Sequence, residues 1–123
     1  MDKRFPKSEH LCSKPLFTDL MENGSGFTAF PLRLVWKEVK LSHEGPYQIA
    51  FSVSKRRFKR AVDRNRMKRV LREAWRHQKS EVIREIDGVQ YAFLIVYVSN
   101  EMLDFNELLP VMEKAIAKWK SKK

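Results

Sequence analysis

The stretch AVDRNRMKRVLREAWR, residues 61–76, combines an apolar helical face with a dense run of basic side chains. On a helical wheel its apolar residues gather on one side, and Trp75 falls at the boundary of that side. The apolar residues are Met67, Val70, Leu71 and Ala74. This spacing predicts an amphipathic helix whose apolar side packs against a core. We expect the helix to run from Asp63 to about Ile86 and to end at Asp87-Gly88.

The opposite side of this helix carries only polar and basic residues. They are Arg64, Asn65, Lys68, Arg69, Arg72 and Arg76. Four of the basic residues follow one another at i, i+4 steps, where like charges repel and destabilise a helix. A helix face that is merely solvated usually mixes both signs of charge. The uncompensated basic row therefore favours a polyanionic partner.

The net charge of the chain is concentrated in one segment, residues 55–76. This segment has eleven basic and two acidic residues, a net charge of +9, whereas the whole chain of 123 residues carries +10. Eight of the eleven are arginines, whose planar guanidinium groups suit phosphate contacts and stacking on bases. The distribution indicates a nucleic-acid partner first and an anionic membrane surface second. A basic protein without a polyanionic partner is the remaining interpretation of the composition alone.

Length and composition predict a single globular domain that spans residues 1–123, with 43% hydrophobic residues. The charged ends, residues 1–10 and 120–123, are expected to fray. The single cysteine, Cys12, excludes an intramolecular disulfide and suits a reducing compartment. The chain begins without the apolar stretch of a secretory signal, and its longest apolar run, residues 91–98, is too short to span a bilayer. We therefore expect a cytoplasmic protein that does not associate with membranes.

Two shorter helices are expected on either side of the basic helix. The first spans residues 13–24, and residues 24–26 then read as a loop. The last spans residues 104–119 and opens with a capping box between its first residue and Glu107. Pro110 lies inside this last pattern and is expected to kink the helix or to move its start later.

Three strands are expected, at residues 32–41, 47–54 and 91–98. The first two flank a turn and are expected to pair as a hairpin, whereas the third is apolar on both faces and suits a central position. Alternation in the first strand separates two faces, with Leu32, Leu34 and Trp36 on one and Arg33, Val35 and Lys37 on the other. The order α-β-β-α-β-α predicts an α+β sandwich, a small central sheet packed by helices.

A longer motif surrounds the basic helix. It consists of SVSKR, residues 52–56, and AVDRNRMKRVLREAWR, residues 61–76. Over residues 51–76 the chain resembles the bacterial ribonuclease P protein component, in which a strand ending in SVSKK leads through a short connector to a helix opening with Arg-Asn-Arg. The resemblance implies that family's fold, with a βαβ crossover through the Arg-Asn-Arg helix that is left-handed, against the usual rule.

The resemblance also implies a function, that of a subunit of an endoribonuclease, a hydrolase acting on precursor tRNA. In this family the protein binds the catalytic RNA and the 5′ leader of precursor tRNA, and it assists Mg²⁺-dependent removal of the leader. Catalysis belongs to the RNA, which also binds most of the Mg²⁺, so no catalytic or metal-binding side chain is expected. The implied partners are the ribonuclease P catalytic RNA and precursor tRNA, without an obligate protein partner.

Residues of this chain that match the family pattern are assigned by the resemblance to two surfaces. The RNA-binding surface comprises Lys55, Arg56, Arg64, Asn65, Arg66, Lys68, Arg69 and Arg72. The leader-binding cleft comprises Phe17, Met21, Arg33, Val35, Trp36, Ser52 and Ser54. The i, i+4 spacing of the first two cleft residues is equally that of a buried helix face, so a purely structural role for this pair is an open alternative.

Three positions depart from the family pattern. His10 stands where relatives have arginine, Met21 where they often have an aromatic residue, and Tyr97 where they often have a basic residue. A methionine can pack on a base, but less specifically than an aromatic ring. The departures concern leader contacts rather than the basic helix.

Two other functional classes agree with parts of the sequence. A DNA-binding module would place the basic helix in a major groove, but a strand and a connector precede this helix instead of the short helix and tight turn of a helix-turn-helix. A self-contained nuclease would need catalytic side chains, and the three histidines and one cysteine lack metal-ligand spacing. The acidic residues at positions 101, 104 and 107 fit a helix start better than a cation site.

Overall fold

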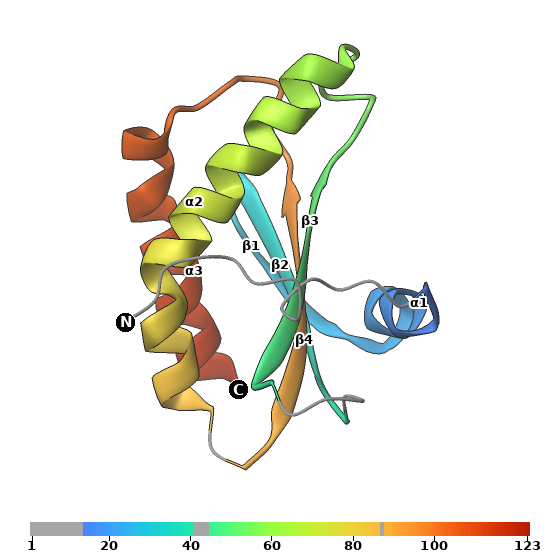
Figure 1. Cartoon of the computed structure of the whole chain (residues 1–123), viewed down its shortest axis with the longest axis vertical. Coiled ribbons are helices and arrows are strands. Elements are labelled where there is room, and N and C mark those ends of the chain that lie inside the picture. Colours follow the sequence, from blue (N-terminus) through green and yellow to red (C-terminus); the bar gives the residue numbers. More distant parts are fainter. Residues whose placement is uncertain (1–13, 41–44, 87) are drawn as a thin grey trace.

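The computed structural model describes residues 14–40, 45–86 and 88–123, and within them the chain forms three helices and four strands. In chain order these are α1 (Lys14–Asn23), β1 (Ser25–Ala29), β2 (Leu32–Val39), β3 (Tyr47–Val53), α2 (Ala61–Glu85), β4 (Gln90–Tyr97) and α3 (Phe105–Lys122). Figure 1 shows α2 and α3 on one side of the sheet and α1 on the other. The predicted α+β class is confirmed.

The four strands form one sheet in the order β1-β2-β4-β3. The central position predicted for residues 91–98 is confirmed, because β4 pairs antiparallel with β2 and parallel with β3. Neighbouring parallel strands need a crossover connection, and α2 provides it between β3 and β4. The βαβ unit through the Arg-Asn-Arg helix is thus present, while its left-handedness stays a prediction.

Two predictions about the strands were wrong. Of the expected loop at residues 24–26, Ser25 and Gly26 instead start β1, which pairs with β2 from Ser25 opposite Trp36 to Ala29 opposite Leu32. The expected hairpin of β2 and β3 does not form, because β4 lies between them. Both errors have one cause: the pairing of a strand is decided by partners far along the chain, which local composition does not reveal.

Gly24 allows α1 to turn directly into β1. Its amide donates to the carbonyl of Leu20 at 2.9 Å. A Cβ at this position would lie 2.4 Å from the same carbonyl oxygen and 2.9 Å from Cγ1 of Val35, so any larger residue would push the helix away from the sheet. The glycine therefore sets how closely α1 approaches β2.

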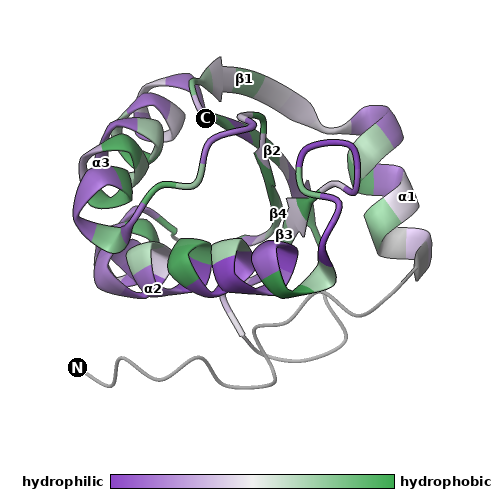
Figure 2. Cartoon of the chain, turned by 90° about the horizontal axis from the view of Figure 1, so that it is seen from above, coloured by the Kyte–Doolittle hydropathy of each residue, from purple (hydrophilic) through white to green (hydrophobic). Residues whose placement is uncertain are grey.

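The sheet separates two hydrophobic cores. The larger core lies between the sheet and the pair α2 and α3, whose hydrophobic sides face inward (Figure 2). The smaller lies under α1 and is built on four buried residues, Leu20, Val35, Ala92 and Leu94. The alternation predicted for residues 32–37 is confirmed, because Leu32 and Leu34 face the larger core and Val35 faces the smaller one.

Trp75 holds α2 against the sheet. The sequence placed this residue at the edge of the apolar side, but its side chain is fully buried. Its indole Nε1 donates to the hydroxyl of Tyr47 at 3.1 Å, and its ring lies 5.3 Å from that of Phe93. The buried arc of α2 is wider than the wheel predicted because the helix packs against α3 as well as against the sheet.

The capping box of α3 is confirmed. The Asp104 carboxylate accepts from the amide of Glu107 at 2.8 Å, and the Glu107 carboxylate accepts from the amide of Asp104 at 3.5 Å. The helix begins at Phe105 and contains Pro110, so the start is not delayed. The last residues, expected to fray, continue the helix to Lys122, and the amide of Lys123 donates to the carbonyl of Trp119.

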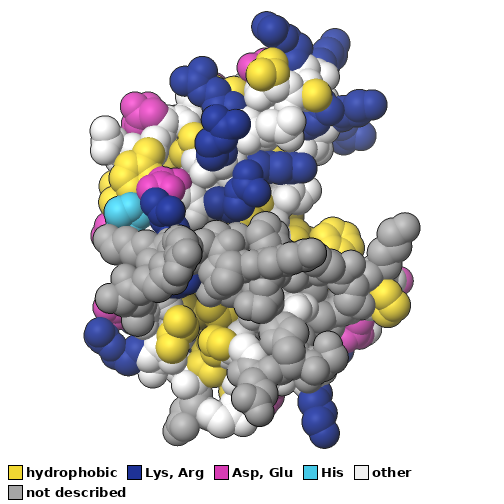
Figure 3. Space-filling view, viewed as in Figure 1, with side chains coloured by type: hydrophobic (Ala, Val, Ile, Leu, Met, Phe, Trp, Pro, Cys, Tyr) yellow, Lys and Arg dark blue, Asp and Glu magenta, His cyan; other side chains and the backbone are white. Residues whose placement is uncertain are grey.

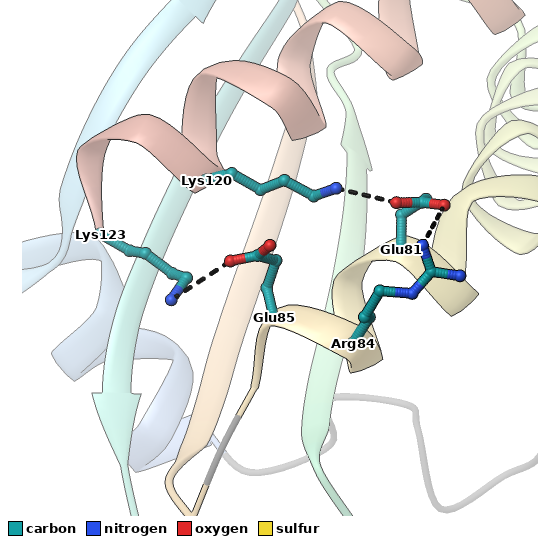
Figure 4. Close-up of polar contacts among 5 residues, drawn as sticks. All are labelled: Glu81, Arg84, Glu85, Lys120 and Lys123. Atoms are coloured by element: carbon teal, nitrogen blue, oxygen red, sulfur yellow. Dashed lines mark hydrogen bonds and ion pairs between the residues drawn. The ribbon is translucent and has the colours of Figure 1, made fainter.

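Ion pairs join the C-terminal half of α2 to the end of α3 (Figure 4). Glu81 contacts Lys120 at 2.9 Å and Arg84 at 3.3 Å, and Glu85 contacts Lys123 at 3.6 Å. The hydrogen bond from Lys120 lowers the pKa of the Glu81 carboxyl. These groups are solvated, so the pairs orient the two helices more than they stabilise them.

Replacing Tyr47 with Phe is expected to lower the free energy of unfolding by about 1–3 kcal/mol, because the buried indole N–H of Trp75 loses its acceptor. Urea unfolding monitored by tryptophan fluorescence measures the change. The matched control is Tyr97→Phe, which removes a hydroxyl that donates to the backbone carbonyl of the exposed residue Glu101. Water can satisfy that carbonyl, so the control should be milder. An equal loss for both variants would contradict the role of the Trp75–Tyr47 bond.

Candidate nucleic-acid interface

The N-terminal half of α2 presents basic side chains that have no partner in the part of the chain that the structure describes. Among the described residues, no hydrogen bond or ion pair engages the side chains of Lys68, Arg69 or Arg72. Arg76 differs, because it is paired with Glu73 at 2.6 Å. Of the predicted i, i+4 row, Lys68 and Arg72 are therefore available as cations, Arg76 is neutralised, and Arg64 has contacts within the protein.

Arg64 begins this row and also holds the connector between β3 and α2. Its Nη1 donates to the carbonyls of Phe58 at 3.0 Å and Lys59 at 2.9 Å. A guanidinium has five N–H donors, so others remain for an external acceptor. Arg64 therefore has a positioning role that the sequence did not reveal.

The connector, residues 54–60, is fixed at several points. The backbone carbonyl of Ser54 accepts from the amides of Arg57 and Phe58 at 3.1 Å each. The Phe58 ring stacks on Tyr97, with ring centroids 6.1 Å apart. These contacts hold the connector next to α2. The connector presents four exposed basic residues, Lys55, Arg56, Lys59 and Arg60. The last two were counted in the basic segment but not assigned to the site, and the charge count was the signal that could have included them.

Figure 3 shows the resulting surface. Lys and Arg side chains gather over the connector and the N-terminal half of α2, at the top of the view. Few acidic side chains interrupt them there. Arg66 is exposed but belongs to a different side of the helix, because it lines a groove with the residues that begin α3. The structure thus brings most of the predicted RNA-binding residues together and sets Arg66 apart.

The second predicted surface lies beside α1. Among the described side chains of α1, Leu20 enters the core, whereas Phe17 is 38% exposed and Met21 is 54% exposed. A role for this pair as core alone is therefore wrong. Lys37 binds the Asp19 carboxylate from β2, and this hydrogen bond lowers the pKa of Asp19 and ties the helix to the sheet.

The register of the sheet aligns two of the predicted residues on the α1 side. Arg33 of β2 and Ser52 of β3 both lie opposite Val96 of β4, so the three form one row across the sheet. Val35 lies in the next row and is buried under α1. The Arg33–Ser52 row is at the end of β3 that leads into the connector, so the two predicted surfaces adjoin there.

The structure places Trp36 outside the leader-binding surface, and it buries Tyr97, a position that departs from the family pattern. Trp36 was predicted there, but it packs on the larger core, with its ring 6.4 Å from that of Tyr91. Neighbouring residues of a strand point to opposite faces, so Trp36 cannot share a face with Val35. Tyr97 is buried on the same side as Trp36, and its burial raises the pKa of its hydroxyl. Tyr97 supports the connector through Phe58, and Ser54 begins the connector.

The family profile of ribonuclease P matches residues 5–120. The ribonuclease P protein component of Porphyromonas gingivalis is 34% identical over 114 residues, which cover 89% of this chain and 82% of that protein. The chain belongs to the ribonuclease P protein family.

Solved structures of this family have the same fold. The RNase P protein of Staphylococcus aureus superposes with a TM-score of 0.72 at 17% identity. The superposition covers 93% of this chain and 97% of the Staphylococcus aureus chain. The RNase P protein of Thermotoga maritima superposes with a TM-score of 0.69 at 16% identity, with 89% and 96% covered. At these identities the superpositions show the fold alone.

Membership of the ribonuclease P family makes the chain a subunit of an RNA-processing endoribonuclease with a role in tRNA processing, and it implies an RNA partner. In the described ranges, no helix is long and apolar enough to cross a membrane. No group of three His, Cys, Asp or Glu side chains able to hold a metal occurs among the described residues. His10, Cys12 and His43, which lack metal-ligand spacing in the sequence, lie outside those residues.

Replacing both Arg69 and Arg72 with Ala is expected to weaken binding to a structured RNA. The slope of log affinity against log salt should fall by about 0.7–0.9 for each phosphate contact that is lost. The matched control is the pair Lys114→Ala and Lys122→Ala, which removes the same charge from the exposed surface of α3. Filter binding at several salt concentrations gives both slopes. Equal losses for the two double variants would show that net charge, rather than this surface, determines binding.

Proposed function

We propose that this chain binds the catalytic RNA of ribonuclease P through the connector and α2, and the 5′ leader of precursor tRNA along the surface beside α1. In this role it assists Mg²⁺-dependent removal of the leader to give the mature 5′ end. The observation that carries the proposal is the junction of the two surfaces, where the Arg33–Ser52 row meets the basic connector. One RNA molecule and its substrate can thus be held side by side by one protein.

Binding of the catalytic RNA is supported by the cations of α2 and by the start of that helix. Lys68, Arg69 and Arg72 are available for phosphate contacts, which supply most of the affinity in such interfaces. Arg60, at the N-cap of α2, makes no side-chain cap hydrogen bond. The first amides of α2 therefore add to the positive potential that the arginines create. RNA phosphates would neutralise the repulsion within the basic row.

Leader binding is supported by the combination of exposed apolar and polar groups beside α1. Single strands are held by stacking of bases on planar or soft side chains and by cations that follow the backbone. Phe17 and Met21 supply the first kind of contact and Arg33 the second. Because Met21 is not aromatic, Phe17 would supply the main stacking surface.

Catalysis in the proposal belongs to the RNA subunit. The described residues offer no cluster of side chains fit to hold Mg²⁺. In keeping with the family resemblance, we assign the ion to the RNA partner and assign no chemical step to the protein. The protein's contribution is to neutralise phosphates and to position the leader, which lowers the Mg²⁺ concentration that the RNA requires. A cytoplasmic location is part of the same proposal.

Reconstitution with the cognate catalytic RNA tests the proposal directly. At low Mg²⁺, the protein is expected to increase the rate of leader removal from precursor tRNA over that of the RNA alone. The Arg69→Ala and Arg72→Ala double variant should need more protein to reach the same rate, and raising Mg²⁺ should reduce the difference. No gain in rate at any protein concentration would refute the assignment, as would cleavage by the protein without RNA.

Replacing Phe17 with Ala is expected to weaken leader binding without affecting binding to the catalytic RNA. The loss should be about 1–3 kcal/mol, the contribution of one base–aromatic contact. Affinity of the reconstituted complex for precursor tRNA with a leader and for mature tRNA measures the effect. Because Phe17 is partly exposed, the fold should tolerate the change, which circular dichroism can check. An equal loss of affinity for both tRNAs would contradict a leader contact.

A further inference from the structure

A groove of about 520 Å³ separates α2 from the start of α3. Arg66 and Val70 line it from α2, and residues 102–105 with Glu107 line it from the loop after β4 and the first turn of α3. Its volume is within the usual range for sites that hold a small ligand, about 300–1,000 Å³. Neither proposed surface uses this groove.

Arg66 connects the groove to the basic surface. It belongs to the Arg-Asn-Arg sequence that opens α2, but it lies on the side that faces α3 rather than in the row of Lys68 and Arg72. Figure 3 shows acidic and hydrophobic side chains gathered where α3 begins, close to basic side chains over α2. An RNA strand bound along α2 would therefore pass the entrance of the groove.

The walls of the groove combine basic, apolar and acidic side chains. Val70, Met102, Leu103 and Phe105 supply apolar and aromatic surface. The carboxylate residues Asp104 and Glu107 also line it. Glu107 is exposed, and its carboxylate accepts only a long hydrogen bond of 3.5 Å from the amide of Asp104 in the capping box. The carboxylate can therefore accept a further hydrogen bond. The groove thus offers a cation, apolar side chains and two carboxylates.

We infer that this groove receives one unpaired nucleotide of the bound RNA, with its phosphate at Arg66, its base against the apolar side chains, and an exocyclic amino group of the base donating to Glu107. The inference rests on the proposed function, because α2 must first bind RNA. A carboxylate accepts well from the N4 amino group of cytosine, whereas uracil presents a carbonyl at that position. The groove should therefore prefer cytosine to uracil.

The mixed charge of the groove argues against other occupants. A duplex would bring a second phosphate backbone close to the carboxylates of Asp104 and Glu107, and the negative charges would repel each other. A basic peptide would be attracted by the two carboxylates but repelled by Arg66 and by the surrounding basic surface of α2. A single nucleotide offers both kinds of partner, because its phosphate is an anion for Arg66 and its base carries donors for a carboxylate.

Two short oligonucleotides provide the test. Penta-cytidylate and penta-uridylate carry the same phosphates and similar rings, so the basic surface should bind both equally. The full chain is titrated with each while NMR signals of the Met102 methyl group and the Leu103 amide are followed. Both signals should shift on saturation, and penta-cytidylate should bind about fivefold more tightly.

The variant Glu107→Gln tests the contribution of the Glu107 carboxylate. Glutamine is also favourable at this position of a capping box, so α3 should keep its start. The ratio of the affinity for penta-cytidylate to that for penta-uridylate should fall toward one, because the glutamine amide is a weaker acceptor and can also donate to uracil. The matched control is Glu113→Gln, an identical change at an exposed site of α3 outside this groove, which should leave the preference unchanged.

The outcomes separate this inference from the function on which it depends. Shifts at the amides of Arg69 and Arg72, with none at Met102 or Leu103, would refute the groove and leave RNA binding by α2 intact. Equal affinity for the two oligonucleotides in the unaltered chain would refute the role of Glu107. Absence of shifts at both places would count against the proposed function and overturn the inference with it.

Discussion

The packing of Trp75 against Tyr47 and Phe93 is the interaction on which the rest of the structure depends. These three residues belong to α2, β3 and β4, the three elements of the βαβ crossover. Trp119 extends the cluster to α3, with its ring 5.2 Å from that of Phe93. Aromatic pairs in such edge-to-face geometry contribute beyond the area that they bury. One cluster therefore fixes the helix, the two parallel strands and the second helix relative to one another.

The fixed position of α2 determines how the basic side of this helix is presented to solvent. A helix with several like charges at i, i+4 spacing is weakened by repulsion, and such a helix would be marginal alone. Here the buried side, with Met67, Leu71, Ala74 and Trp75 fully buried, offsets the repulsion. The basic side chains are consequently arrayed on a rigid element before any partner binds. Less ordering is then needed at the moment of association.

The sequence predicted the helices, the central strand and the basic surface, because each is encoded in local periodicity or in charge. Strand β1 escaped prediction because Ser25 and Gly26 lack apolar alternation, and its place was decided by pairing with β2. The neighbours of β3 were also decided by distant residues. Trp36 was assigned to the wrong surface because similarity to a family places a strand but does not fix its faces. Arg64 illustrates the remaining limit, because its contacts with backbone carbonyls depend on the course of the connector.

The two halves of α2 differ in their charge balance, and this has a kinetic consequence. The half up to Arg76 is strongly basic, whereas the half that is paired with α3 through Glu81 and Glu85 is close to neutral. The positive end of the helix dipole coincides with the basic half, so the molecule is strongly polarised along this axis. In the field of a polyanion such a molecule experiences a torque before contact. The protein therefore approaches the polyanion with the start of α2 facing it. A larger share of encounters then has the correct orientation, which raises the association rate.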